Sequence, residues 1–249
     1  MADRFYCPDP PISGQFTIEG DEARHLVRVR RLGVKDQVEL FDGRGYATCA
    51  EVRAVGRDRV ELVAVGAALP DRPLPCRLTL ATAVPKGERF DWLIEKATEL
   101  GVTKLIPIIT ERSVVDPRDA KLERLRRRVV EASKQCGRNR LMEVERPTPW
   151  SALLTSRAHG VRLLAHPSGA PRGRWPRSEE GQAGAVTLAV GPEGGFTDAE
   201  VDEAQTHGWS IVGLGSTILR IETAGLVGAS AVLAQYEVGD ESAVGSGPS

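Results

Sequence analysis

Residues Val186–Ala224 of this 249-residue chain read VTLAVGPEGGFTDAEVDEAQTHGWSIVGLGSTILRIETA. The apolar run Val186–Val190 is typical of a strand buried in a parallel sheet. The run ends at residues 191–195, GPEGG, a turn whose glycines let the backbone approach a ligand closely. A second buried strand, Ile211–Leu214, ends at another glycine turn at Gly215. Two neighbouring strand ends with glycine turns predict the crevice in which α/β sheets bind ligands.

A helix is predicted to begin directly after the first glycine turn. Thr197 and Glu200 have the spacing of a capping box, in which each side chain accepts a hydrogen bond from the backbone amide of the other residue. The unpaired amide groups of the first helical turn then point back toward the glycine turn.

The chain from Cys76 onward alternates strands with helices, which predicts an α/β domain with a parallel sheet. Strands are expected at Arg77–Val84, Leu105–Ile109 and Val161–Ala165, and helices at 90–100, 121–134 and 150–157. The first of these helices has one apolar face, and Gly101 is placed to end it. A C-terminal helix carries small residues, such as Gly225 and Gly228, that fit either a dimer interface or the core of a monomer.

The segment Ser168–Gly184 is rich in Pro, Gly, Ser and Arg, and we expect it to be a mobile surface loop. Trp175 lies within this segment. Its ring either stacks on a base or packs against its own loop, and the second reading requires no ligand.

Residues 1–72 have a different pattern and predict a separate small β-barrel domain. Short β-prone runs at 37–41, 46–55 and 59–65 alternate with turn signals such as Asp42-Gly43. One short helix is expected at Asp21–Arg30. The proline-rich segment Leu69–Pro75 is the predicted linker to a second domain at 73–240, and the polar residues 241–249 are expected to be disordered.

Composition narrows the class of protein. Lys and Arg number 33 against 34 Asp and Glu, a net charge of −1, so a nucleic-acid surface must come from local clusters. The four cysteines, Cys7, Cys49, Cys76 and Cys136, form no CxxC pair, which favours reduced thiols over a disulfide framework or a metal site. No long apolar run or signal peptide is evident, which predicts a cytoplasmic protein without a membrane or metal partner.

Several motifs in a fixed order carry a resemblance to a known family. They are HLVRVRRL at 25–32, KGERFDWLIEKATELGV at 86–102, EASKQCGRNR at 131–140, GPEGGF at 191–196 and LGSTILRIETA at 214–224. Together they resemble the bacterial 16S rRNA (uracil-N3)-methyltransferase family of the SPOUT class. The resemblance implies a SPOUT-type parallel sheet with a C-terminal trefoil knot, preceded by a PUA-like RNA-binding β-barrel. It also implies a homodimer that uses S-adenosyl-L-methionine to methylate a uridine in the decoding region of the small ribosomal subunit.

The resemblance implies that the glycine turns and nearby loops hold the cofactor. The implied cofactor-binding residues are His166, Gly191, Pro192, Glu193, Gly194, Leu214, Gly215, Ile218, Leu219 and Thr223. Close approach of the cofactor to the backbone explains the glycines at 191, 194 and 215 better than a side-chain function does.

Methyl transfer to N3 of uracil requires in-line positioning, removal of the N3 proton and stabilisation of the charge left on the base. Arg220 is the catalytic residue that we single out, because its guanidinium can hold an RNA phosphate or the charge on a uracil oxygen. An ion pair between Arg220 and Glu222 is the structural alternative. Glu193 either accepts the N3 proton or only complements the positive end of the following helix.

Basic residues in three regions are the candidates for RNA contact. They are Arg4, Arg24, His25, Arg28, Arg30, Arg31, Lys86, Arg138, Asn139 and Arg140. The alternatives are ordinary: a solvated helix face for the arginines near the amino terminus, a solvated loop for Lys86, and a partly buried structural role for His25.

Two other functions compete with the methyltransferase hypothesis. A non-catalytic ribosome-assembly or RNA-binding factor of the same fold would have no need for both GPEGG and ILRIETA. A nucleotide-dependent dehydrogenase would require GxGxxG in the first turn between strand and helix, and residues 85–88 read PKGE there.

Overall fold

The computed structural model describes residues 3–10, 13–24, 26–27, 30, 32–66, 68–71, 74–115, 119–156, 160–177 and 184–237. Contacts between residues divide the chain into two units. The first comprises Met1–Pro73 and Val129–Leu141, and the second comprises Leu74–Arg128 and Met142–Ser249. Residues 129–141 belong to the first unit because of their tertiary contacts, which local sequence patterns do not predict. The domain boundaries at 72 and 240 stay a prediction, and the tail at 241–249 lies outside the described residues.

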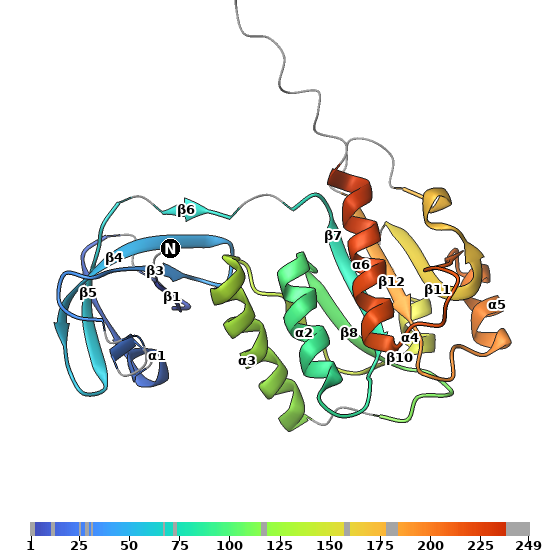
Figure 1. Cartoon of the computed structure of the whole chain (residues 1–249), viewed down its shortest axis with the longest axis horizontal. Coiled ribbons are helices and arrows are strands. Elements are labelled where there is room, and N and C mark those ends of the chain that lie inside the picture. Colours follow the sequence, from blue (N-terminus) through green and yellow to red (C-terminus); the bar gives the residue numbers. More distant parts are fainter. Residues whose placement is uncertain are drawn as a thin grey trace, which may run out of the picture. The chain divides into compact units, whose positions relative to one another are not determined.

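The first unit contains a six-stranded mixed sheet (Figure 1). Its strands are β1 (Asp3–Tyr6), β2 (Gln15–Glu19), β3 (Gln37–Phe41), β4 (Tyr46–Val55), β5 (Arg59–Ala64) and β6 (Leu69–Pro70). The order is β1-β3-β4-β5-β2, with β6 paired to β4 and β1 parallel to β3. The three predicted β-prone runs are confirmed as β3, β4 and β5. A pairing of β1 with β2, which would close the sheet into a barrel, is not among the described strand pairs.

The helix predicted at Asp21–Arg30 is described in part. Helix α1 covers Gly20–Arg24, and His25, Arg28 and Val29 lie outside the described residues. Leu26 and Val27 form a π-helical turn, so helical structure extends to Val27 among the described residues.

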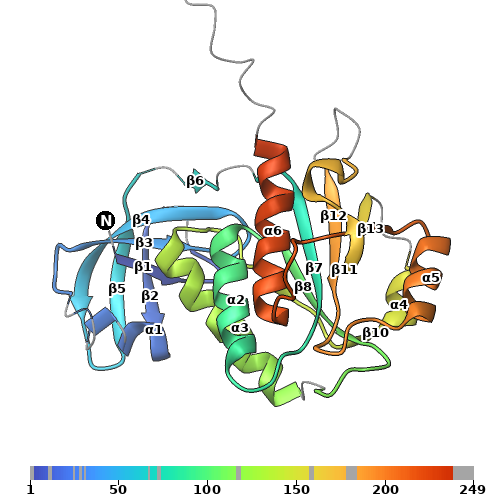
Figure 2. The ribbon, with the colours of Figure 1, turned by 45° about the vertical axis from the view of Figure 1, so that its right-hand side comes forward.

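The second unit contains a seven-stranded sheet in which all described pairs are parallel (Figure 2). Its strands are β7 (Arg77–Ala83), β8 (Lys104–Ile109), β9 (Glu143–Val144), β10 (Thr148–Pro149), β11 (Val161–Ala170), β12 (Ala185–Val190) and β13 (Ser210–Val212). The order is β10-β8-β7-β12-β11-β13, with β9 paired to β8. Leu188 in the middle of β12 lies opposite Leu80 on one side and Leu163 on the other, and all three are buried. The predicted parallel sheet is therefore confirmed, with β12 among its central strands.

Helices lie between these strands, and one helix follows the last strand. They are α2 (Arg89–Leu100), α3 (Asp119–Cys136), α4 (Trp150–Leu154), α5 (Asp198–Thr206) and α6 (Ile221–Glu237). Helix α2 buries its predicted apolar face and ends at Gly101, which has a φ of 98°. That left-handed conformation is accessible to glycine at little cost.

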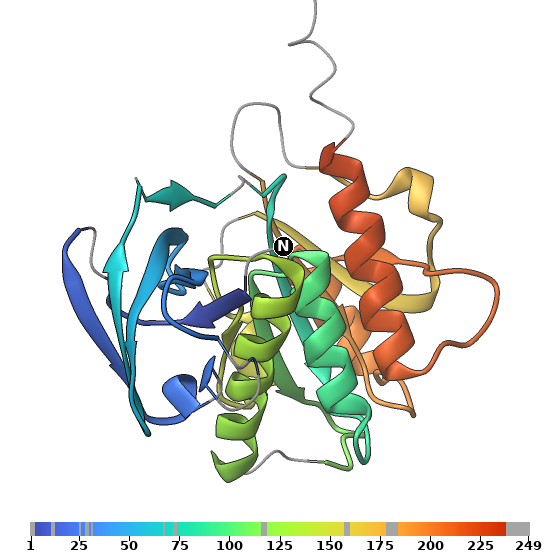
Figure 3. The same ribbon diagram turned by 60° about the vertical axis from the view of Figure 1, so that its left-hand side comes forward.

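Helix α6 packs on β7 and β12 with α2 beside it (Figure 3). A Cβ on Gly228 would lie 2.5 Å from Cδ2 of Leu188, and one on Gly225 would lie 3.2 Å from Cδ1 of Leu93. The sequence left open whether these glycines serve a dimer interface or the core of a monomer. The structure shows that they pack α6 against the core of its own chain.

The loop predicted at Ser168–Gly184 begins later in the structure, because Ser168–Ala170 belong to β11. Strand β11 continues to Ala170, because a second strand, β13, pairs with it there, and a 3-10 helix follows at Arg172–Arg174. Trp175 is buried and its indole N–H donates to the carbonyl of Ala170 over 3.1 Å. The ring therefore packs against its own segment, as the ligand-free reading predicted, and 178–183 lie outside the described residues.

Candidate active site

The two glycine turns lie at the same edge of the sheet, one on each side of the end of β11. Strand β11 lies between β12 and β13, and Ala165 is opposite Val190 on one side and Val212 on the other. The chain leaves both outer strands directly after these residues. Strand register thus brings the two turns to one edge of the sheet, with one strand between them, whereas the sequence predicted adjacent strand ends.

A cavity of about 540 Å³ lies between the two turns. Three segments line it: Ala165–Pro167 after β11, Val190–Phe196 after β12 and Leu214–Ile221 after β13, apart from Ser216. Every predicted cofactor residue lines the cavity except Thr223. Arg112, Asp198 and Ala224 complete the lining, and the volume falls within the range of about 300–1,000 Å³ typical of ligand pockets.

The GPEGGF turn has a fixed backbone conformation. The amide of Gly195 donates to the carbonyl of Pro192 over 2.8 Å, and Gly195 has a φ of 69°, which disfavours any residue with a side chain. A Cβ on Gly191 would lie 2.9 Å from the ring of Phe196. Glycine at these two positions is therefore required by the turn itself.

An aromatic cluster supports the turn. The ring of Phe196 lies 4.9 Å from that of Trp150, which in turn lies 5.1 Å from that of Trp209. All three side chains are buried. Tilted aromatic pairs at these distances are favourable, so the end of the turn has a rigid support.

The predicted capping box is confirmed at the start of α5. The backbone amide of Glu200 donates to Oγ1 of Thr197, and the amide of Thr197 donates to Oε2 of Glu200. The other carboxylate oxygen of Glu200 accepts from the amide of Glu111 over 2.9 Å. One carboxylate thus connects α5 to the segment that follows β8.

Glu193 in the turn is ion-paired with Arg89 at the start of α2, with Nη1 and Oε1 3.6 Å apart. Nε of the same arginine lies 4.0 Å from Oε1 of Glu222, which is buried. Arg89 therefore contacts both carboxylates. It belongs to the KGERFDW motif, in which no local pattern indicates that Arg89 pairs with these carboxylates.

Arg220 is exposed and lines the cavity. No ion pair joins it to Glu222 within the described residues, so the structural alternative for Arg220 is not realised. His166 also lines the cavity. Its Nδ1 is hydrogen-bonded to Oγ of Ser168 at 2.8 Å.

Comparisons with known proteins give the family. A model of the RNA methyltransferase domain matches residues 72–233, and a model of the RNA methyltransferase PUA domain matches 18–65. The chain belongs to the RNA methyltransferase family. Ribosomal RNA small subunit methyltransferase E from Bacillus subtilis is 32% identical over 90% of this chain and 91% of its own length. Its counterpart from Synechocystis is 33% identical over 92% of this chain and 76% of its own length.

Solved structures of family members have the same fold. Ribosomal RNA small subunit methyltransferase E from Neisseria gonorrhoeae, bound to S-adenosyl methionine, superposes with a TM-score of 0.85 at 30% identity. A methyltransferase from Legionella pneumophila, in complex with the same cofactor, gives 0.85 at 28% identity. Both matches cover 94% of this chain and 98% of the other. The SPOUT-type α/β fold with a PUA domain is therefore confirmed, while the trefoil knot stays a prediction.

The cavity of this RNA methyltransferase fits S-adenosylmethionine. No atom lies within 4 Å of the position that a Cβ would occupy on Gly195 or Gly215, so both turns leave room against their backbone. Pro192, Leu214 and Ile218 offer apolar surface for an adenine ring. Ile218 is 94% exposed and lines the cavity, so its apolar side chain is accessible to a ligand there.

Several residues predicted to contact RNA have intramolecular partners in this family member. Arg4 donates to the carbonyls of Gly137 and Arg138 and also pairs with Glu39 at 2.8 Å. Arg138 and Asn139 are buried, and burial lowers the pKa of the Arg138 guanidinium from its ordinary value. These contacts give Arg4, Arg138 and Asn139 a structural role, and their contact with RNA stays a prediction.

The remaining predicted RNA contacts are divided between exposed and undescribed residues. Lys86 and Arg140 are exposed. Arg30 pairs with Asp3 at 2.7 Å, and Arg24 lies 3.9 Å from Asp58. His25, Arg28 and Arg31 lie outside the described residues.

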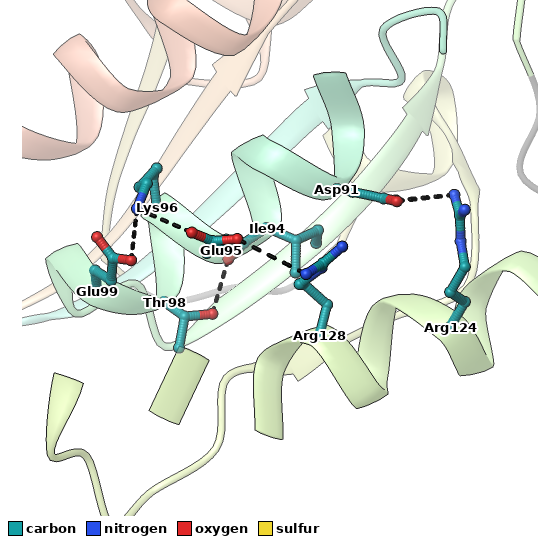
Figure 4. Close-up of polar contacts among 8 residues, drawn as sticks. All are labelled: Asp91, Ile94, Glu95, Lys96, Thr98, Glu99, Arg124 and Arg128. Carbon is teal, nitrogen blue, oxygen red and sulfur yellow. Dashed lines mark hydrogen bonds and ion pairs between the residues drawn. The ribbon is translucent and has the colours of Figure 1, made fainter. Parts of the chain in front are cut away.

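Two arginines of α3, Arg124 and Arg128, contact α2 (Figure 4). Nη2 of Arg124 lies 3.0 Å from each carboxylate oxygen of Asp91, and Arg128 lies 4.0 Å from Glu95. These pairs recur every four residues on both helices. Two of the arginines in this run are therefore engaged within the second unit.

Two negative findings concern the described residues alone. They contain no group of three or more His, Cys, Asp or Glu side chains that could hold a metal ion. None of their helices is long and apolar enough to cross a membrane.

Proposed function

We propose that this protein methylates N3 of a uridine in 16S rRNA of the small ribosomal subunit, in the decoding region, with S-adenosyl-L-methionine as the methyl donor. The observation that carries the proposal is the cavity between the two glycine turns, lined by the predicted cofactor residues and by Arg220. The names of relatives at 32% and 33% identity support the class of substrate, and two cofactor-bound neighbours support the donor.

The bound donor would supply an electrophilic methyl group on sulfonium. The backbone of Gly191, Gly194 and Gly215 would hold it close to the strand ends. Binding both reactants in one cavity supplies positioning, which accounts for a large part of the rate in transfers of this kind.

Arg220 is the candidate for charge stabilisation. Its guanidinium has no ion-pair partner within the described residues and lines the cavity, so it is available to a uracil oxygen or an RNA phosphate. Negative charge develops on the uracil oxygens when N3 loses its proton.

Glu193 is the candidate acceptor of the N3 proton. Among the described residues, it is one of two carboxylates that line the cavity, and the other is Asp198 in the first turn of α5. Asp198 already complements the positive helix end, which leaves Glu193 for the proton. Arg89 then holds the Glu193 carboxylate in place.

A homodimer in the cytoplasm is part of the same proposal. Trp92 on α2 is 47% exposed, which leaves a large aromatic side chain, of a type enriched at protein interfaces, accessible to a partner. Light scattering should give twice the mass of the chain, and Trp92→Glu should shift the protein toward monomer. A wild-type monomer would contradict the dimer.

The function is tested on small subunits from a bacterial strain that lacks this methylation. Purified protein and S-adenosyl-L-methionine should produce 3-methyluridine, measured by mass spectrometry of nucleosides, and Arg220→Ala should reduce the yield about 100-fold. Binding to subunits without any methyl transfer would contradict the proposal and support the non-catalytic assembly factor.

A further inference from the structure

A tight turn after β8 lies against the cofactor turn. Oγ of Ser113 accepts from the amide of Thr110 over 2.9 Å, and the amide of Ser113 donates to the carbonyl of Thr110 over 3.1 Å. Thr110 is buried, so the base of this turn is fixed in the core. Glu111 and Arg112 form its tip.

The tip contacts the GPEGGF segment and the helix that follows it. Nη1 of Arg112 donates to the carbonyl of Gly194 over 2.7 Å. The amide of Glu111 donates to Oε1 of Glu200, whose other oxygen caps α5. The turn at 110–113 is therefore hydrogen-bonded to Gly194 within the glycine turn and to Glu200 in the helix after it.

Glycine at 194 permits the contact. A Cβ on Gly194 would lie 3.3 Å from Cδ of Arg112. The arginine stem thus lies along the glycine backbone, and the short bond to the carbonyl is charge-assisted, which makes it stronger than a neutral hydrogen bond.

Arg112 is one of two arginines that line the cavity, together with Arg220. Neither has a carboxylate partner among the residues that the structure describes, whereas Arg89 beside them is paired twice. The hydrogen bond to Gly194 is the interaction that accounts for the position of Arg112.

We propose that Arg112 is a positioning residue for the cofactor turn: its bond to the Gly194 carbonyl holds GPEGG in the conformation that binds S-adenosyl-L-methionine. The inference rests on the proposed function for the identity of the ligand. Without this bond, the carbonyl of Gly194 is hydrogen-bonded to water instead of Arg112. The GPEGG turn must then become ordered when the cofactor binds. That ordering costs conformational entropy and weakens affinity.

The test compares Arg112→Met, Arg112→Lys and the control Arg146→Met in the full chain. Arg146 is exposed and does not line the cavity. Calorimetry should show that the Kd for S-adenosyl-L-methionine rises about tenfold in Arg112→Met, the cost of one net hydrogen bond, and less in Arg112→Lys, which keeps a donor. The control should bind as the wild type does.

A second readout needs no ligand. Hydrogen exchange of the amides at 193–196 should be faster in Arg112→Met than in wild type, with exchange in β7 and α6 unchanged. In turnover with small subunits, KM for the cofactor should rise while kcat at saturation stays within about threefold.

Three outcomes overturn the inference: an unchanged Kd in Arg112→Met, unchanged exchange at 193–196, or a rise in KM for RNA alone, which would make Arg112 an RNA contact. A wild-type protein that binds no S-adenosyl-L-methionine would instead contradict the proposed function. The exchange experiment would still decide whether Arg112 orders the turn.

Discussion

Arg89 lies 3.6 Å from Glu193, and this ion pair connects the first residue of α2 to the glycine turn after β12. The pair holds one of the two cavity carboxylates at a defined place. A carboxylate that accepts the N3 proton must be oriented toward that proton as well as close to it, because proton transfer depends on hydrogen-bond geometry.

Replacing Glu193 by glutamine should lower kcat about 100-fold if this carboxylate takes the N3 proton. The cofactor Kd should change less than threefold, since the amide has the same shape. Single-turnover methyl transfer measures the first quantity and calorimetry the second.

Asp198→Asn is the matched control, because Asp198 also lines the cavity and asparagine is tolerated near a helix start. We expect its kcat to stay within about threefold of wild type. Equal losses in both variants would contradict the assignment of the proton acceptor to Glu193.

Gly228→Val should destabilise the protein by about 2–3 kcal/mol, because even a Cβ at this position would lie 2.5 Å from the Leu188 side chain. The site is in the core, where β12 and α6 meet, so the sheet cannot move away without loss of packing. Urea denaturation measures the free energy of unfolding. Gly173→Val is the control, since nothing lies within 4 Å of a Cβ there, and it should be near neutral.

The predictions from sequence succeeded where one local pattern determines the structure. The apolar run Val186–Val190, the glycines after it and the capping box of Thr197 each specify their conformation through near neighbours in the chain. The cavity followed from these features, because strands that end at the same edge bring their turns together.

The predictions did less well where partners come from distant segments. Arg4 looks like a free cation in the sequence, but it is engaged by residues more than 130 positions away. Arg112 carried no signal because its partner is a backbone carbonyl, which any residue has. Ser168–Ala170 looks like loop, and its extended pairing depends on β13.

Arg124→Ala should lower the free energy of unfolding by about 1 kcal/mol, because it leaves the nearly buried carboxylate of Asp91 without its cation (Figure 4). The arginine itself is largely exposed, which keeps the effect modest. Arg127→Ala, an exposed neighbour on the same helix, should change stability by less than about 0.5 kcal/mol. Equal effects in the two variants would show that the pair with Asp91 contributes nothing.

The central claim is that the two glycine turns hold S-adenosyl-L-methionine between them, and a crystal structure of the protein with this cofactor tests it most directly. The account predicts density for the whole donor in contact with the backbone at 191–195 and 214–219, with its methyl group facing the side on which Arg220 lies. Density at another site, or none in this cavity at saturating cofactor, would contradict the account.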